Sequence, residues 1–216
     1  MKIKKIGHCC LLIQLDGLTI LTDPGNFTVE QNKVTGIDVV LITHEHGDHL
    51  HIESVKEVLK NNPQAKIITN SGVGANLKEA GIAYQLLEGK DGTATTKIKN
   101  VLLEAYDGKH VEIFEEIGQV QNTGYFIDGK LFYPGDAYTV PAKPVDTLAL
   151  PVAGPWCKIA DAIRYALAVK PKKAFPVHDA VLRAEMRGFS AKLVEPILAK
   201  NGTQFISMGD GDEKEF

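Results

Sequence analysis

Short apolar runs, separated by glycine, asparagine and aspartate, recur along most of the chain. Two alternating apolar runs within residues 3–22 flank Asp16-Gly17, a dipeptide that supplies the positive backbone angles of a tight hairpin. Residues 37–43 form a continuous apolar run, which predicts a strand buried on both faces. From Ile52 onward apolar residues recur at helical spacing until Asn62-Pro63, so a helix follows this strand.

The remaining patterns repeat this order of strands followed by helices. We expect strands within 66–70, 84–106, 147–152, 174–177 and 204–208, a hairpin at 123–133, and helices near 73–80, 159–167 and 193–198. Two halves built in this way most economically stack their sheets face to face with the helices outside. We therefore predict an α+β fold, a four-layer αββα sandwich, in which residues 1–216 form a single domain.

The composition is that of an ordinary globular protein. Hydrophobic residues make up 44% of the 216 positions and charged residues 24%, which leaves no room for a long disordered tract. The formal net charge of -3 argues against nonspecific binding of nucleic acid through bulk electrostatics. No apolar run approaches the ~18 residues of a membrane span. The odd number of cysteines and the absence of a signal-peptide pattern predict a reducing, cytoplasmic location.

The run of residues 44–49 carries the clearest chemical signal. It follows the apolar stretch 37–43 and places four potential metal ligands within six residues, namely His44, His46, Asp48 and His49. Such imidazole and carboxylate groups suit zinc, iron or manganese. Gly47 lets the chain turn, so the last two ligands can approach a second ion. Solvated histidines in a chance loop are the alternative, but three of the 7 histidines share this run, and we favour a two-metal hydrolase.

Three further candidates stand where an apolar segment gives way to a loop: His110, Asp136 and His178. Strand ends of packed sheets converge on one cleft, which is the geometry that a catalytic metal site needs. Asp136 follows Pro134-Gly135, a turn in which the glycine permits close backbone approach. Alone, each candidate would be an ordinary turn or surface residue; beside the 44–49 run, each becomes a predicted ligand.

These motifs together resemble those of the metallo-β-lactamase-fold hydrolase superfamily. The resemblance rests on H-x-H-x-D-H, a downstream histidine, a Gly-Asp after a strand and a final strand-end histidine, and it covers most of the chain. Gly7-His8 and the segments 21–24, 150–152 and 171–178 resemble the branch of L-ascorbate-6-phosphate lactonase-like and N-acyl-phosphatidylethanolamine phospholipase D-like proteins. The resemblance implies a cofactor of two Zn²⁺ ions per chain, with Mn²⁺ or Fe as alternatives.

The resemblance also implies roles for individual residues. One metal would be held by His44, His46 and His110, the other by Asp48, His49 and His178, with Asp136 bridging both. Asp23 would fix the tautomer of a ligand imidazole, although a turn residue before Pro24 is an equal account. His8 is a candidate for protonating a leaving group or binding substrate, and a buried strand histidine is the alternative. Trp156 lies in a loop near the expected cleft, where ordinary packing is the simpler account.

A site with two divalent ions would carry a net positive charge at the base of the cleft. Two divalent ions outweigh the negative charge of Asp48, Asp136 and one hydroxide, and a pair roughly 3.5 to 4 Å apart can generate hydroxide near neutral pH. We therefore predict that bridging hydroxide, oriented by Asp48, attacks an ester, lactone or phosphodiester bond of a small molecule, with a mild lean toward substrates that carry phosphate. A non-catalytic metal-binding or ligand-binding module on the same fold is one alternative. A di-iron redox protein is another, which His46 in place of a glutamate disfavours.

Overall fold

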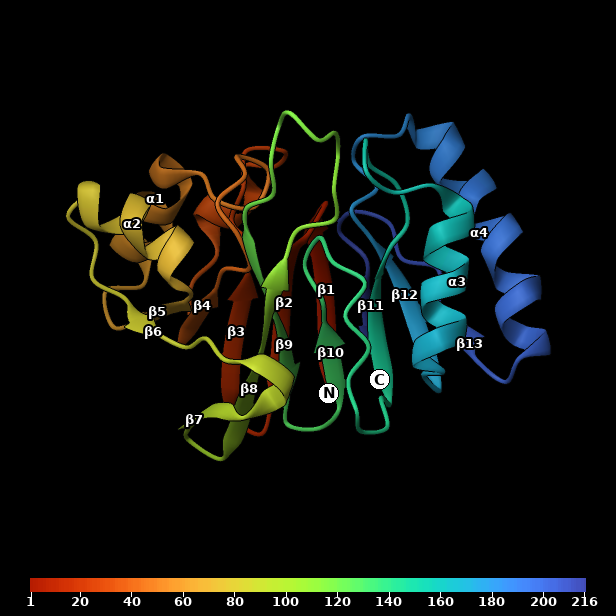
Figure 1. The fold of residues 1–216 in the computed structure, drawn as a ribbon. Coiled ribbons are helices and arrows are strands. Elements are labelled where there is room, and N and C mark those ends of the chain that lie inside the picture. The colour runs from red at the N-terminus through yellow and green to blue at the C-terminus, as the bar shows by residue number, and fades with distance from the viewer.

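The computed structural model describes residues 1–216, apart from the side chain of Phe189. The strands of these residues form two mixed sheets that stack face to face, and helices cover the outer face of each sheet (Figure 1). The predicted α+β, four-layer αββα sandwich is thus confirmed.

The first sheet contains the amino-terminal strands and the carboxyl-terminal one. In spatial order it consists of β14 (Glu213–Glu215), β1 (Lys2–Gly7), β2 (Cys10–Leu15), β3 (Leu18–Thr22), β4 (Val39–Leu41), β5 (Lys66–Thr69) and β6 (Gln85–Leu86). Neighbours from β14 to β3 are antiparallel, and those from β3 to β6 are parallel. The predicted hairpin joins β2 to β3, with φ of 47° at Asp16 and 77° at Gly17.

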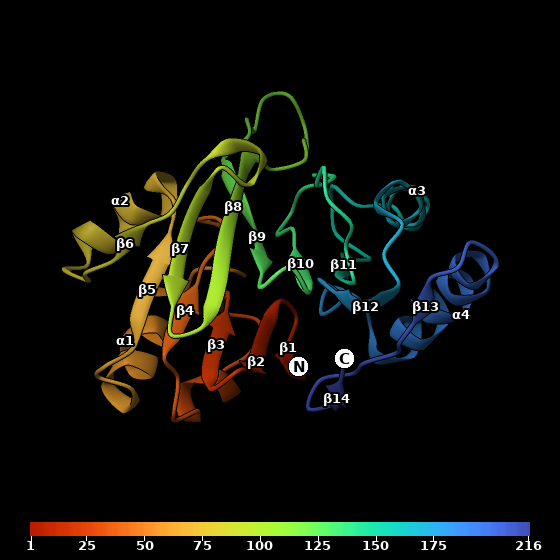
Figure 2. The same ribbon diagram turned by 90° about the horizontal axis from the view of Figure 1, so that it is seen from below.

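The second sheet mirrors this plan. In spatial order it consists of β13 (Gln204–Phe205), β12 (Lys173–Val177), β11 (Thr147–Pro151), β10 (Leu131–Tyr133), β9 (Gln121–Ile127), β8 (Val101–Lys109) and β7 (Ala94–Ile98). Its strands are antiparallel from β7 to β10 and parallel from β10 to β13. In Figure 1 strands β8 to β10 of the second sheet lie in front of β1 to β3 of the first, and Figures 1 and 2 both show the two chain ends close together.

Three apolar layers hold the sandwich together. The layer between the sheets includes Leu11, Ile20, Tyr125 and Phe175, all of them buried. The helices α1 (Ile52–Asn61) and α2 (Ser71–Glu79) pack on the first sheet, and α3 (Ile159–Val169) and α4 (Ala184–Lys200) pack on the second. Two short 3-10 helices, η1 (Glu30–Lys33) and η2 (Lys90–Gly92), lie in connecting loops. Among the described residues, no helix is long and apolar enough to cross a bilayer.

Several elements differ from the sequence-based prediction. The helix expected near 193–198 extends over Ala184–Lys200, and the strand expected at 204–208 is only Gln204–Phe205. The strand expected at residues 37–43 is shortened to Val39–Leu41, because the chain leaves the sheet early to form the loop that carries residues 44–49. Strand β14 was not predicted, because all its residues are charged and exposed. It joins the sheet through main-chain pairing with β1, in which Lys2 lies opposite Glu215, and such pairing leaves no hydrophobic pattern in the sequence.

Strand direction brings the candidate residues to one edge of the sandwich. In the first sheet, β1, β3 and β4 run the same way and end just before His8, Asp23 and His44. In the second sheet, β8, β10 and β12 share a direction and end shortly before the other candidates, His110, Asp136 and His178. The loops that follow these strands therefore meet across the two sheets.

Candidate metal centre

Asp136 lies at the centre of the cluster of predicted ligands. Its Oδ2 atom is 2.9 Å from Nε2 of His178, 3.3 Å from Nε2 of His110 and 3.8 Å from Nε2 of His44. Its Oδ1 atom is 3.2 Å from Nε2 of His49. One carboxylate therefore faces four imidazoles that come from both sheets.

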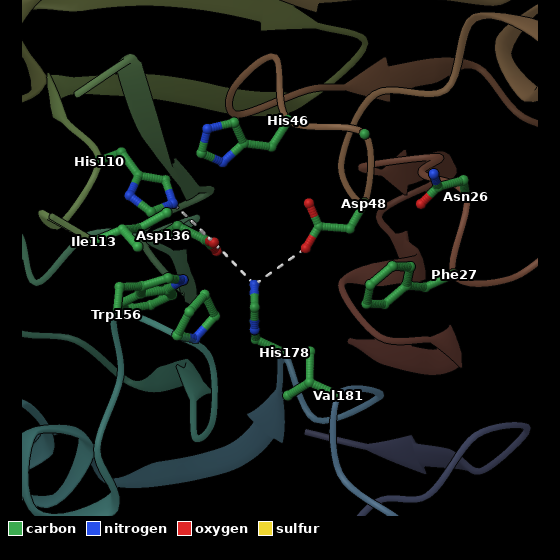
Figure 3. Close-up of a pocket in the computed structure, with 12 residues that line it drawn as sticks. Asn26, Phe27, His46, Asp48, His110, Ile113, Asp136, Trp156, His178 and Val181 are labelled. Carbon is green, nitrogen blue, oxygen red and sulfur yellow. Dashed lines mark ion pairs between the residues drawn. The ribbon is translucent and has the colours of Figure 1, made fainter. Parts of the chain in front are cut away.

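The other predicted ligands complete two groups around Asp136. The ligand atoms of His44, His46 and His110 all lie within 4.8 Å of one another. On the opposite side, Oδ2 of Asp48 is 3.4 Å from Nε2 of His178 and 3.8 Å from that of His49. Figure 3 shows His46 and His110 on one side of the cavity and Asp48 with His178 on the other. The structure thus brings the predicted ligands together around Asp136. Two further groups of ligand atoms lie equally close, one of His44, His49 and Asp136 and one of His8, Cys9, His49 and His178.

Backbone carbonyls orient the two ligand histidines of the second sheet. Nδ1 of His178 donates to the carbonyl oxygen of Ala153 at 2.6 Å, and Nδ1 of His110 donates to that of Val111. A carbonyl only accepts, so each ring carries a proton on Nδ1 and turns its Nε2 toward Asp136. A histidine held in this way would bind a metal through Nε2 once that nitrogen is unprotonated.

A buried network around Asp23 orients the histidines of the first sheet. Nδ1 of His49 donates to Asp23 Oδ2 at 2.7 Å, and the hydroxyl of Thr43 donates to the same oxygen at 2.8 Å. Because that hydroxyl has only one proton, Nδ1 of His44 is the donor in its 3.0 Å contact with Thr43 Oγ1. The hydroxyl of Tyr133 also donates to Asp23, at 2.6 Å. Asp23 therefore stands where a tautomer-fixing carboxylate was predicted.

Unpartnered buried atoms show that the cluster suits metal ions. Among the described side chains, buried polar atoms without a hydrogen-bond partner include Nε2 of His44, His49, His110 and His178 and Oδ1 of Asp136. Buried polar groups are nearly always satisfied, so orphaned atoms gathered at one point indicate a missing partner. Nitrogen and oxygen donors in this mixture are those that zinc accepts. The residues therefore fit a divalent transition metal.

Charge at the centre also favours cations. Burial on its own would raise the pKa of Asp136, but the positive charges of His49 and His178 hold it well below its usual range. Burial would likewise lower the pKa of His49 and His178, but Asp136 holds both well above the ordinary value. Burial, followed by the charge of His49, keeps the pKa of His44 well below normal. The buried carboxylate therefore stabilises positive charge on the groups around it.

His8 lies behind Asp48. Its Nδ1 accepts from the backbone N–H of Ala180 at 3.2 Å, so its proton is on Nε2, which donates to Asp48 Oδ2 at 3.1 Å. Burial lowers the pKa of His8, which agrees with a neutral ring. The side chain is buried and is not among the described residues that line the adjacent cavity. This geometry favours a role in holding Asp48 over direct contact with substrate.

Backbone conformation is unusual at three of the predicted site residues. His8, Asp23 and His178 have φ of 54°, 37° and 59°, which lie in the left-handed region that L-residues rarely adopt. Each follows directly on a strand and turns the chain away from its sheet. Strain of this kind concentrates where side-chain direction matters for function, and it supports a functional site here.

Two glycines allow the loops of the site to approach closely. A Cβ atom on Gly25 would lie 1.8 Å from the backbone oxygen of Asp48, so only glycine fits beside the ligand loop. Gly135 has φ of 63°, and a Cβ atom there would lie 2.4 Å from Oδ1 of Asn122, which accepts from the backbone N–H of Asp136. The predicted close approach at Gly135 is confirmed. Gly25 was not predicted, because nothing near it in sequence shows that a distant loop packs on it.

A cavity of about 580 Å³ opens beside the cluster. His46, Asp48, His110, Asp136 and His178 face it from the metal-binding side (Figure 3). Other lining residues are mainly apolar and include Phe27, Ile113, Pro155, Trp156 and Val181. A volume of this order suits a small molecule rather than a polymer.

Comparison with known proteins identifies the family. The profile of the beta-lactamase superfamily domain matches residues 2–178. Protein Rv0786c of Mycobacterium tuberculosis is 33% identical over 193 residues, which cover 87% of this chain and 88% of that protein. A UPF0173 metal-dependent hydrolase of Alkaliphilus metalliredigens is 26% identical and covers 82% of this chain and 85% of its own length. An N-acyl-phosphatidylethanolamine-hydrolyzing phospholipase D of Caenorhabditis elegans is 28% identical over 42% of this chain and 28% of its own length.

Solved structures support the fold. A protein of Parabacteroides distasonis superposes with a TM-score of 0.75 at 24% identity and covers 95% of this chain and 91% of its own. Igni18, a metallo hydrolase of Ignicoccus hospitalis, superposes with a TM-score of 0.72 at 20% identity over 100% of this chain and 98% of its own. The profile match over most of the chain agrees with the resemblance predicted from the motifs. The chain therefore belongs to the beta-lactamase superfamily.

Proposed function

We propose that the chain is a two-metal hydrolase that cleaves an ester, lactone or phosphodiester bond of a small molecule. One observation carries the proposal: four buried imidazole nitrogens and the carboxylate of Asp136 converge beside a cavity without protein partners for their lone pairs. Relatives named metal-dependent hydrolases support the same class of activity.

The ligand sets follow the geometry of the cluster. His44, His46 and His110 would hold one ion, Asp48, His49 and His178 the other, and Asp136 would contact both. Zinc is the metal that we propose, because imidazole and carboxylate ligands suit it. A pair of such ions held by these residues would supply hydroxide near neutral pH and would stabilise negative charge that develops on the substrate.

Asp48 is the residue that we propose orients the attacking water. Its side chain is 20% exposed and faces the cavity, while Oδ2 accepts the hydrogen bond from His8. Burial would raise the pKa of Asp48, but hydrogen bonds from His178 and His8 hold it well below its usual range. The carboxylate therefore stays ionised and can accept a hydrogen bond from a water molecule in the cavity. His8 fixes the direction of this carboxylate.

A small panel of chromogenic and acid-releasing substrates tests the proposal. Zinc-loaded protein should hydrolyse at least one of bis(4-nitrophenyl) phosphate, 4-nitrophenyl acetate and γ-butyrolactone, and a chelator should abolish this turnover until zinc is restored. Bound zinc without turnover on the whole panel would favour the non-catalytic module. Iron in the purified protein with visible absorbance would favour the di-iron redox alternative.

Replacing Asp23 tests whether its network supports metal binding. Asp23→Asn removes the charge that holds the Nδ1 proton of His49, so we expect metal affinity to fall roughly 10- to 100-fold. Competition with a fluorescent chelator measures this affinity. Asp38→Asn is the matched control, because Asp38 accepts the backbone N–H of Thr19 and pairs with Lys99 on the surface of the same sheet. Equal affinities for Asp23→Asn and the wild type would refute the role given to Asp23.

A further inference from the structure

Trp156 lies between the two groups of proposed ligands. Its ring packs edge-on against His110, with a centroid distance of 5.5 Å, and against His178, with a centroid distance of 5.3 Å. The side chain is 7% exposed and lines the cavity. Figure 3 shows the indole on the wall beside His110 and His178 and across the cavity from Phe27. A substrate held at the metal centre would therefore contact this side chain.

The indole nitrogen of Trp156 is a donor without a protein partner. Nε1 is buried and makes no hydrogen bond to any described atom. An indole N–H can only donate, and buried donors are rarely left unpaired. A Cβ atom on Gly154 would lie 3.0 Å from this nitrogen and 3.2 Å from Cε1 of His178. The missing side chain of Gly154 thus lets the indole nitrogen and the ring of His178 border the same space.

Apart from the proposed metal ligands, the described lining of the cavity is mainly apolar. None of the described residues that line the cavity is lysine or arginine. Phe27, Ile113 and Val181 supply apolar surface, and the side-chain amide of Asn26 adds a further polar group to this lining. A phosphate or carboxylate on the distal part of a substrate would find no cationic partner here. The apolar lining of the cavity therefore disfavours phosphorylated substrates, which the positive charge of the metal centre alone had favoured.

We propose that Trp156 is a substrate-binding residue whose indole N–H donates to an oxygen of the scissile group, in substrates that carry an uncharged, apolar substituent. The substituent packs against the indole face and Phe27, while the scissile ester or phosphodiester lies at the metal centre. This proposal rests on the proposed hydrolase function and names its substrate class.

The single tryptophan of the chain permits a direct test in the wild-type protein. Its indole N–H gives one peak in a ¹H–¹⁵N correlation spectrum. Phenylphosphonate, which joins an apolar ring to phosphoryl oxygens and is not hydrolysed, should shift this proton downfield in zinc-loaded protein and bind at least about tenfold more tightly than inorganic phosphate. An unchanged peak overturns the proposal. If the peak is unchanged but phenylphosphonate still inhibits turnover, the proposed hydrolase function stands and only the role of Trp156 is refuted.

A variant separates the N–H group from the apolar ring. Trp156→Phe keeps an aromatic wall but removes the donor, so kcat/KM for bis(4-nitrophenyl) phosphate or 4-nitrophenyl acetate should fall roughly tenfold with metal content unchanged. Tyr138→Phe is the matched control, because Tyr138 packs on Trp156 at 5.5 Å and is not among the described cavity-lining residues. Equal losses in the two variants, or no loss in Trp156→Phe, would contradict the role of the N–H group.

Discussion

Asp136→Ala is expected to lower turnover roughly 1000-fold or more and to release bound metal. The carboxylate faces the Nε2 atoms of four imidazoles, at distances between 2.9 and 3.8 Å, and it is the group that both proposed metal ions share. Its removal would leave neither ion with a full set of ligands. A 1000-fold loss of rate corresponds to several kcal/mol of transition-state stabilisation, because each factor of ten in rate is about 1.4 kcal/mol.

Turnover on the most active panel substrate and metal content by mass spectrometry measure the effect of Asp136→Ala. Asp161→Ala is the control, because it removes a partly exposed carboxylate that pairs with Arg164 within α3. We expect that variant to retain wild-type turnover and metal. Wild-type turnover in Asp136→Ala, with both metals still bound, would refute the assignment of the shared ligand.

Lys5→Met is expected to lower the free energy of unfolding by about 3–5 kcal/mol. The ammonium group of Lys5 is fully buried and donates to Asp179 at 2.7 Å and to the carbonyl oxygen of Pro176 at 3.1 Å. This ion pair joins β1 of the first sheet to the loop that follows β12 and His178 in the second. Removing the cation leaves the buried carboxylate of Asp179 without its counter-charge.

Urea unfolding of the same preparation measures this loss of stability. Lys2→Met provides a matched control on the same strand, because Lys2 pairs with Glu213 at 2.7 Å but both side chains are more than 40% exposed. An exposed pair contributes at most about 1 kcal/mol. If the two variants lose equal stability, the Lys5 pair is not the link between the sheets that the structure indicates.

Much of the site could be predicted because ligand residues leave a local signal. The run at 44–49 concentrates imidazole and carboxylate groups, and His110, Asp136 and His178 each close an apolar segment. Strands that share a direction end at the same edge of the sandwich, so the ligands that follow them converge there. The order of the layers follows from the same alternation of strands and helices.

Residues that act through long-range contacts gave no such signal. Tyr133 closes an apolar strand and looks like a core residue, yet its hydroxyl donates to Asp23, 110 positions away in sequence. Gly25 and Lys5 depend in the same way on backbone or carboxylate groups that distant loops supply. For Trp156 the sequence favoured ordinary packing, because only the three-dimensional arrangement shows that the side chain lines a cavity and that its N–H group has no partner among the described residues.

Metal content per chain is the most direct test of the central claim, which is that distant loops assemble a site for two cations. After expression in zinc-replete medium and removal of loosely bound ions, mass spectrometry should find about two zinc ions for each chain. Fewer than one bound transition metal per chain would contradict the account, whatever the fold and the family of the protein.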